Sequence, residues 1–98
     1  MMRIDNIIWL PEVVDKLSWK HRVSPEEVEE IFSGNPVYRK VQKGHVPGED
    51  LYAALGQEES GRYLIVFFVY KRTHEALIVS ARDMDGKERK TYAQYKER

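Results

Sequence analysis

The fold is decided by the stretch "RYLIVFFVYKRTHEALIVSA", residues 62–81, in which two apolar runs flank a short polar turn. The first run, residues 62–70, is nearly continuous and rich in aromatic and β-branched side chains, which is typical of a central strand covered on both faces. "KRTHE" then predicts a turn, and "ALIVSA" predicts a final strand. Strands joined by so short a connection must be antiparallel. The sequence therefore predicts an antiparallel sheet built around this hairpin.

More strands are predicted upstream of the hairpin. From residue 37 the pattern takes a period of two, with Val37 and Val41 on one side of a strand, and residues 51–55 alternate in the same manner. "GQEESG" supplies the polar, turn-rich connection to the central strand. "NIIW", residues 6–9, predicts a short first strand. We therefore expect a sheet of about four antiparallel strands plus this small one.

Two helices are predicted between the first strand and residue 37. Pro11 suits the first turn of a helix, because the missing N–H of proline has no partner there to lose. The second helix has a clearer start, since Ser24 caps it, Pro25 is its first residue, and Glu27 completes a capping box. The turn sequence "SGNP" ends it. The predicted apolar face of the first helix consists of Leu10, Val14, Leu17 and His21.

A third helix is predicted after the last strand. Asp83 or Asp85 can cap it, and Glu88 stands three residues after Asp85, where a capping-box partner belongs. Together these elements predict an α+β fold with two N-terminal helices, an antiparallel sheet and a C-terminal helix. Because the chain has no repeats, low-complexity tracts or flexible linkers, we expect residues 1–98 to form a single domain.

Composition argues against several functional classes. The chain has 16 basic and 16 acidic residues, so it lacks the global positive charge of many nucleic-acid binders, although "YRKVQKGH" and "KERK" are locally basic. The absence of cysteine and the scatter of the three histidines argue against a zinc site, and we expect no metal. The glycines are spread among turns and form no phosphate loop, so no cofactor is expected.

The apolar segments do not predict a membrane protein. The longest of them, residues 63–70, is far shorter than the roughly 20 residues of a membrane-spanning helix. The N-terminus does not show the basic head, apolar run and cleavage site of a secretion signal. We therefore expect a cytoplasmic protein.

Several separated fragments of the chain match one protein family in its order and spacing. They are "IIWLP", "KHRVSPEEVEEIF", "GEDLYAALG", "GRYLIVFFVY" and "IVSARDMDGKERKTY". The chain resembles BrnT, a toxin of bacterial and archaeal type II toxin–antitoxin pairs. The resemblance implies a fold similar to that of RelE-like ribonucleases and cleavage of RNA without a metal. It also implies a cognate DNA-binding antitoxin of ribbon-helix-helix type, with DNA contacted only through that antitoxin.

Some positions depart from the family pattern. Arg22 stands in place of a glycine and Leu10 in place of an acidic residue, while Leu51 and Leu77 each stand in place of an arginine. Two arginines lost from a site that handles phosphate would remove charge and bidentate hydrogen bonds. The alternative to an active ribonuclease is therefore a catalytically decayed member of the fold that acts as a protein-binding module.

Arg82 is the leading catalytic candidate. Cleavage of RNA without metal needs a base for the 2′-hydroxyl proton, an acid for the leaving 5′-oxygen, and fixed positive charge on the transition state. A guanidinium stays protonated at any working pH, and the end of a strand holds it more rigidly than a loop does. The alternative is a structural ion pair of Arg82 with Asp83, Asp85 or Glu49.

Three further residues are catalytic candidates. Lys20 and His21 match a Lys-His pair of the family, and imidazole accepts and gives protons near neutral pH. His21 can equally pack on the apolar face of its helix, and Lys20 can simply be solvated. Glu49 follows a Pro-Gly turn and opens a strand, where a carboxylate could act as a base or could cap the turn.

Arg89 and Tyr92 are the candidates for RNA binding. They lie three residues apart on the predicted last helix, hence on one face, and could offer a cation and a stacking ring to an unpaired base. Tyr92 is equally suited to the packing stripe of that helix. Trp9 and Trp19 are expected in the core, together with the apolar run at 63–70.

Overall fold

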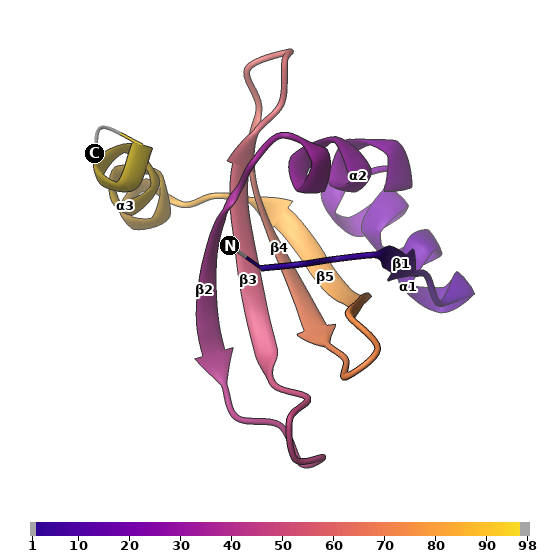
Figure 1. Cartoon of the computed structure of the whole chain (residues 1–98). Helices are drawn as coiled ribbons and strands as arrows, with labels where there is room; N and C mark the ends of the chain where they lie inside the picture. Colours follow the sequence, from indigo (N-terminus) through magenta and orange to yellow (C-terminus); the bar gives the residue numbers. More distant parts are fainter. Residues whose placement is uncertain (1, 97–98) are drawn as a thin grey trace.

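The computed structural model describes residues 2–96, which contain three α-helices, one π-helical turn and five strands. In chain order the elements are β1 (Asn6–Ile8), α1 (Pro11–Lys16), η1 (Leu17–His21), α2 (Pro25–Ser33), β2 (Val37–Gln42), β3 (Leu51–Gln57), β4 (Tyr63–Tyr70), β5 (Glu75–Asp83) and α3 (Gly86–Lys96). Figure 1 shows α3 on one side of the sheet and α1 and α2 on the other. The architecture is therefore α+β, as the sequence predicts.

The five strands form one sheet in the order β1-β5-β4-β3-β2. Strands β2 to β5 pair antiparallel, as their short connections predict, with β4 at the centre. The sequence left the direction of the short first strand open, and the structure decides it: β1 runs parallel to β5, with Ile8 opposite Leu77, so the five-stranded sheet is mixed. No short turn joins these two strands, so the long path between them allows a parallel pairing.

The predicted helix starts are confirmed at α2 and α3. At α2, Ser24 Oγ accepts a hydrogen bond from the Glu27 amide at 3.2 Å, and Glu27 Oε1 accepts one from the Ser24 amide at 3.0 Å. At α3 the cap is Asp85 and not Asp83. Asp85 Oδ1 accepts from the Glu88 amide at 2.8 Å, and Glu88 Oε1 accepts from the Asp85 amide at 2.9 Å. These reciprocal bonds satisfy amides that have no partner inside the helix.

The first predicted helix changes its winding part-way along. The α-helical hydrogen bonding of α1 ends at Lys16, and the chain continues as the π-helical turn η1. Leu17, at the start of η1, is 2% exposed and belongs to the core. Trp19 follows two positions later, about half a helical turn away, and is 74% exposed. The predicted core position of Trp19 is therefore wrong, whereas Trp9 does pack against the core.

Each face of the sheet has its own core, because successive strand residues point to opposite faces. Helices α1 and α2 and the turn η1 cover the larger one. It includes Leu17, Val23, Val28, Ile31, Leu64, Val66, Phe68 and Ile78. The smaller core lies on the α3 side and consists of Ala53, Leu55, Ile65, Met84 and Tyr92.

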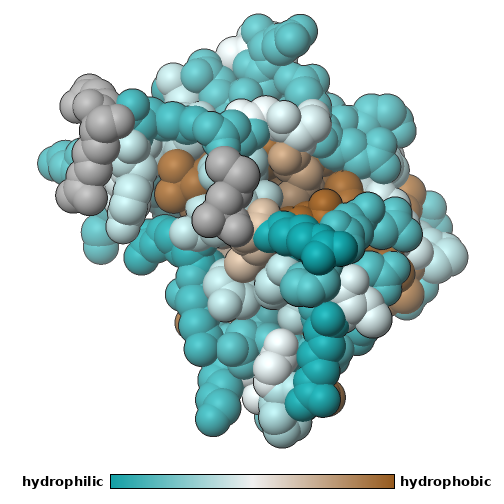
Figure 2. Space-filling model, viewed as in Figure 1, coloured by the Kyte–Doolittle hydropathy of each residue, from teal (hydrophilic) through white to brown (hydrophobic). Residues whose placement is uncertain are grey.

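Helix α3 leaves part of its face of the sheet uncovered. Ile65 of β4 belongs to the smaller core and is 5% exposed, whereas Phe67 and Val69 on the same face are only half-buried. Figure 2 shows that the main apolar area in this view lies from the middle to the right, over the region of β1 and α2, on the other face of the sheet. Hydrophilic residues cover most of the rest of that view. The uncovered part of the α3 face borders the site that contains Arg82.

Candidate functional site

Arg82 lies near the end of β5, opposite Ile65 of β4, on the face of the sheet that carries α3. Its guanidinium donates two hydrogen bonds to the carboxylate of Glu88, at 2.8 Å to Oε1 and 2.9 Å to Oε2. It donates a third to the backbone oxygen of Asp83 at 3.1 Å and lies 5.5 Å from the centre of the Phe67 ring. The ion pair that the sequence offers as an alternative therefore exists, but its partner is Glu88.

The ion pair keeps both of its members charged. The hydrogen bond from Arg82 lowers the pKa of the Glu88 carboxyl, outweighing the opposing effect of partial burial. The Asp85 amide and the nearby charge of Arg39 lower that pKa further. In return, the hydrogen bond to Glu88 raises the pKa of Arg82. The Arg82 side chain is 35% exposed, so it is held in place yet remains accessible from solvent.

A hollow of about 270 Å³ adjoins this ion pair. Arg39 of β2 and Phe67 of β4 face it from either side of Ala53, which is the neighbour of both in the sheet. The small Ala53 side chain leaves room between the two larger ones. Glu88 of α3 also lines the hollow, and its carboxylate pairs with Arg82 of β5 and lies within the electrostatic influence of Arg39 of β2. The complete lining is Arg39, Lys40, Val41, Ala53, Ile65, Phe67 and Glu88.

A second hollow, of about 600 Å³, lies beside α3 and brings the two predicted RNA-binding residues together. Arg89 lies 4.3 Å from the centre of the Tyr63 ring, and Lys96 lies 5.8 Å from that of Tyr92. Tyr92 is only 9% exposed and packs edge-on against Tyr63, with ring centres 6.0 Å apart. The packing role of Tyr92 is thus observed, and the ring beneath the Arg89 guanidinium is that of Tyr63.

Lys20 and His21 lie on the opposite side of the sheet from Arg82. They belong to η1, which packs on the larger core, where Lys20 is exposed and His21 half-buried. Arg62 donates to the His21 backbone oxygen at 2.9 Å and to the Asp83 carboxylate at 2.7 Å. Asp83 is the strand neighbour of Arg82 and therefore points to the other face. The structure brings His21 to the Arg62–Asp83 pair and not to Arg82.

Glu49 lies toward the far end of the sheet from Arg82. It accepts hydrogen bonds from Lys71 Nζ at 3.2 Å and from the Arg72 amide at 3.3 Å, and the bond from Lys71 is the main reason why its pKa is lowered. The strand that follows Glu49 begins opposite Val69, four residues along β4 from the partner of Arg82. Four strand residues span about 13 Å. Glu49 therefore stabilises the β4–β5 turn and is separated from Arg82.

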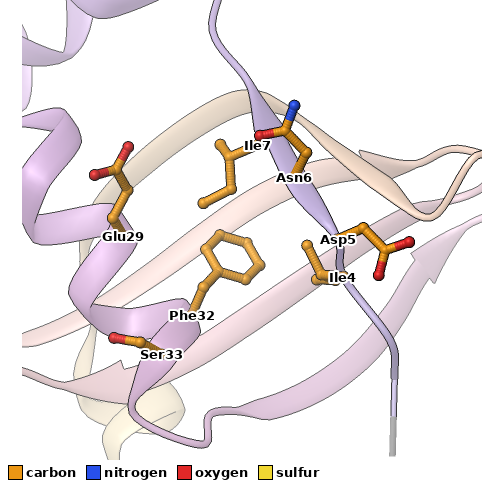
Figure 3. A pocket seen from close by; sticks show the side chains of 7 residues that line it. All are labelled: Ile4, Asp5, Asn6, Ile7, Glu29, Phe32 and Ser33. Carbon is orange, nitrogen blue, oxygen red and sulfur yellow. The ribbon is translucent and has the colours of Figure 1, made fainter.

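A hollow of about 350 Å³ between β1 and α2 is less suited to a polynucleotide. In Figure 3 the side chains of Ile7 and Phe32 point toward each other across it, and the Asp5 carboxylate points away. Its charged lining residues, Asp5 and Glu29, are acidic, so their field repels phosphate. Within residues 2–96, no group of three or more His, Asp or Glu side chains could hold a metal ion.

The arrangement around Arg82 lies within the part of the chain that matches a known family. The family model for "Ribonuclease toxin, BrnT, of type II toxin-antitoxin system" matches residues 9–88, more than half of the chain. The chain belongs to the BrnT family. This confirms the resemblance seen in the sequence, and it implies RNA as substrate and an antitoxin as partner. No curated protein matches the chain.

Two of the positions at which this BrnT-family protein departs from the family pattern lie side by side. Leu51 of β3 and Leu77 of β5 both pair with Val69 of β4, one from each side. Paired residues of neighbouring strands share a face, so the three form an apolar row. The row lies on the same face as Arg82, beyond Phe67, and its members are half-buried. Leucine therefore occupies a surface about 13 Å along the sheet from Arg82, where the resemblance leads us to expect arginine.

Sequence reasoning missed Arg39 and Phe67 as members of the site. Residues 37, 39 and 41 share one side of the predicted strand, and Val37 and Val41 make that side apolar. The charge of Arg39 between them was the sequence feature that could have indicated a functional residue. Phe67 offered no such signal, because every neighbour in its strand is also apolar. Glu88 was recognised as a helix cap but not as the partner of Arg82. Among residues 2–96, no helix is both long enough and apolar enough to cross a bilayer.

Proposed function

We propose that this chain is a metal-independent ribonuclease toxin in which Arg82 stabilises negative charge on the scissile phosphate of RNA. The observation that carries the proposal is the position of Arg82, held by two hydrogen bonds at the edge of an open hollow, inside the region that matches the BrnT model. The proposal includes a RelE-like fold, a cytoplasmic location and neutralisation by a ribbon-helix-helix antitoxin that makes the DNA contacts.

The chemistry assigned to Arg82 is electrostatic. The 2′-hydroxyl of RNA gives its proton to water and attacks the adjacent phosphorus. Negative charge develops on the non-bridging oxygens, and the 5′-oxygen leaves with a proton taken from water. A guanidinium that the Asp83 backbone oxygen and the Phe67 ring hold in place stabilises that charge with little reorganisation during the reaction. Lys20, His21 and Glu49 stay predictions as further catalytic groups. Lys20 and His21 lie on the other face of the sheet and Glu49 lies toward its far end, so no step at the phosphate beside Arg82 is assigned to them. Arg89, above the Tyr63 ring, is proposed to bind RNA outside the cleavage site.

The test is cleavage of total RNA by purified protein in the presence of a chelator. Wild-type protein is expected to cleave, and Arg82→Ala is expected to lose about 100-fold or more in rate, the usual effect of removing one preorganised group that stabilises transition-state charge. Arg3→Ala is the matched control, because Arg3 is an exposed arginine paired with Asp5 near the N-terminus. Cleavage that stops with chelator, or that Arg82→Ala leaves intact, would contradict the proposal.

The second candidate is a decayed member of the family that serves as a protein-binding module. The apolar row of Leu51, Val69 and Leu77 favours it, because a half-exposed apolar row suits a protein partner better than phosphate. Expression in a bacterial host without any antitoxin separates the two candidates. Growth arrest that Arg82→Ala relieves supports the toxin, whereas normal growth with abundant wild-type protein supports the module.

A further inference from the structure

The contact between Arg82 and Glu88 has the geometry of an arginine bound to a phosphate. Both oxygens of the Glu88 carboxylate accept from the guanidinium, at 2.8 and 2.9 Å. The two non-bridging oxygens of a phosphodiester accept from arginine in the same parallel manner. The carboxylate therefore occupies the position that a phosphate would need in order to bind Arg82.

A second arginine, Arg39, lines the hollow beside this position. Arg39 lines the hollow together with Glu88, and after the hydrogen bonds from Arg82 and Asp85 its charge is a further cause of the lowered pKa of Glu88. Arg39 is exposed and forms no ion pair with any residue of the range 2–96. Phe67 lies between the two arginines and offers an apolar surface to a ribose or a base.

We propose that Arg39 and Arg82 together form a phosphodiester-binding site with Phe67 beside it, and that Glu88 occupies this site until RNA displaces it. The proposal rests on the ribonuclease function proposed above and adds to it a second phosphate contact and an internal competitor. Glu88 belongs to α3, which remains anchored when the carboxylate moves, because Met84 and Tyr92 hold that region against the smaller core.

The competitor can be removed without removing the helix cap. Glu88 Oε1 also accepts from the Asp85 amide at 2.9 Å, and the side-chain oxygen of glutamine can accept the same bond. Glu88→Gln therefore keeps the capping box and loses only the negative charge. Glu12→Gln is the control, because it changes the net charge equally at an exposed position on α1.

The first measurement is the affinity for a fluorescent single-stranded RNA of about ten nucleotides, 2′-O-methylated so that it cannot be cleaved. Glu88→Gln is expected to bind it about five-fold more tightly than Glu12→Gln, the size of effect expected when a partly exposed ion pair no longer competes. Adding Arg82→Gln to Glu88→Gln is expected to abolish the gain. Thermal unfolding of each variant shows that the cap and the fold are retained.

The second measurement tests Arg39 in the wild-type background. Arg39→Gln is expected to weaken binding about five-fold at low salt and to reduce the slope of log K against log salt by about 0.7, the loss of one phosphate contact to a single strand. Arg3→Gln removes an exposed arginine near the N-terminus. It is expected to leave the affinity at low salt and the salt slope close to those of wild type. Because Arg39 is exposed on an edge strand, this variant keeps the fold.

The outcomes distinguish this inference from the function on which it rests. If wild-type protein cleaves RNA but Glu88→Gln binds no more tightly than Glu12→Gln, the inference is overturned and the ribonuclease function stands. If Arg39→Gln and Arg3→Gln weaken the affinity for RNA equally, the two-arginine site is overturned. If neither wild type nor Glu88→Gln binds or cleaves RNA, the inference and the ribonuclease function both fall.

Discussion

Neighbouring residues of one strand can have entirely different surroundings. Arg82 faces α3 and pairs with Glu88, whereas Asp83 faces the other helices and pairs with Arg62 at 2.7 Å. Arg62 also donates to Glu27 at 3.0 Å and to the His21 backbone oxygen at 2.9 Å. One arginine thus ties the end of η1, the start of α2 and the end of β5 together.

Glu58 lies beside this cluster and differs from the other acids of the protein. It is 6% exposed, and its Oε2 atom has no hydrogen-bond donor within residues 2–96. Burial and the adjacent Glu27 carboxyl raise the pKa of Glu58, while the pKa of Glu27 is lowered. A proton on Glu58 that is shared with Glu27 explains both directions.

Glu58→Gln is therefore expected to change the pH dependence of stability. A carboxyl group whose pKa is raised by folding stabilises the folded state fully at pH values below its unfolded pKa of about 4.3. This stabilisation is lost as the pH rises through the pKa of the group in the folded state. Glutamine stays neutral at every pH. The free energy of unfolding of Glu58→Gln should therefore increase relative to that of wild type as the pH rises from 4 to 8. Urea unfolding at several pH values measures this difference, with the exposed neighbour variant Glu59→Gln as control. A constant difference across the range would contradict the shared proton.

The helices owe their positions to local signals at their ends, and α2 is the clearest case. Ser24, Pro25 and Glu27 begin it with reciprocal hydrogen bonds, and its buried residues Val28 and Ile31 face the larger core. The close approach of α2 to β3 has a different origin. Gly56 lies where a Cβ atom would come within 3.0 Å of the Ile31 side chain, so the missing side chain lets the two elements meet.

Ser24→Ala is expected to destabilise the protein by about 1 kcal/mol, because the Glu27 amide loses its acceptor at the helix start. Ser33→Ala is the matched control on the same helix, since the exposed Ser33 hydroxyl donates to the Glu30 backbone oxygen and takes no part in the capping box. Urea unfolding of both variants measures the difference. Similar free energies of unfolding for the two variants would show that the capping box contributes little.

At the scale of the whole molecule, ion pairs join elements that are far apart in the sequence. Arg62 joins the β3–β4 connection to α2 and β5, Arg82 joins β5 to α3, and Lys71 joins the β4–β5 turn to Glu49 before β3. Hydrogen bonds from these cations are the main reason for the lowered pKa values of Asp83, Glu88 and Glu49. The contribution of these pairs to stability therefore depends on the charge of the carboxylates.

Acid is expected to weaken the fold. Carboxyl groups whose pKa is lowered by folding contribute stability that is present above the unfolded values of about 4 and is lost as pH falls through the folded values. The unfolding temperature of wild type should thus decrease steadily below pH 4. In Arg82→Gln this decrease should be smaller, because Glu88 loses the partner that lowers its pKa. Thermal unfolding between pH 2 and 6 measures both, and parallel curves for the two proteins would contradict the expectation.

The sequence by itself determined the α+β class, the antiparallel pairing of β2 to β5, the two capping boxes and the family. The class, the strand pairing and the capping boxes depend on residues close together in the chain, such as the alternation of residues 37–41 or the Ser24–Glu27 spacing. The family depends on the order and spacing of separated fragments. Arg82 is predicted as a catalytic candidate in the same way, from its place at the end of a strand.

Only the tertiary structure decided which groups share a site. Whether Arg82 meets Glu88, Arg39 or His21 depends on strand order, on the face to which each side chain points and on the packing of α3. The parallel direction of β1 and the exposure of Trp19 have the same origin. Such contacts join residues far apart in the chain, and local periodicity carries no information about them because it reports only the surroundings of neighbours.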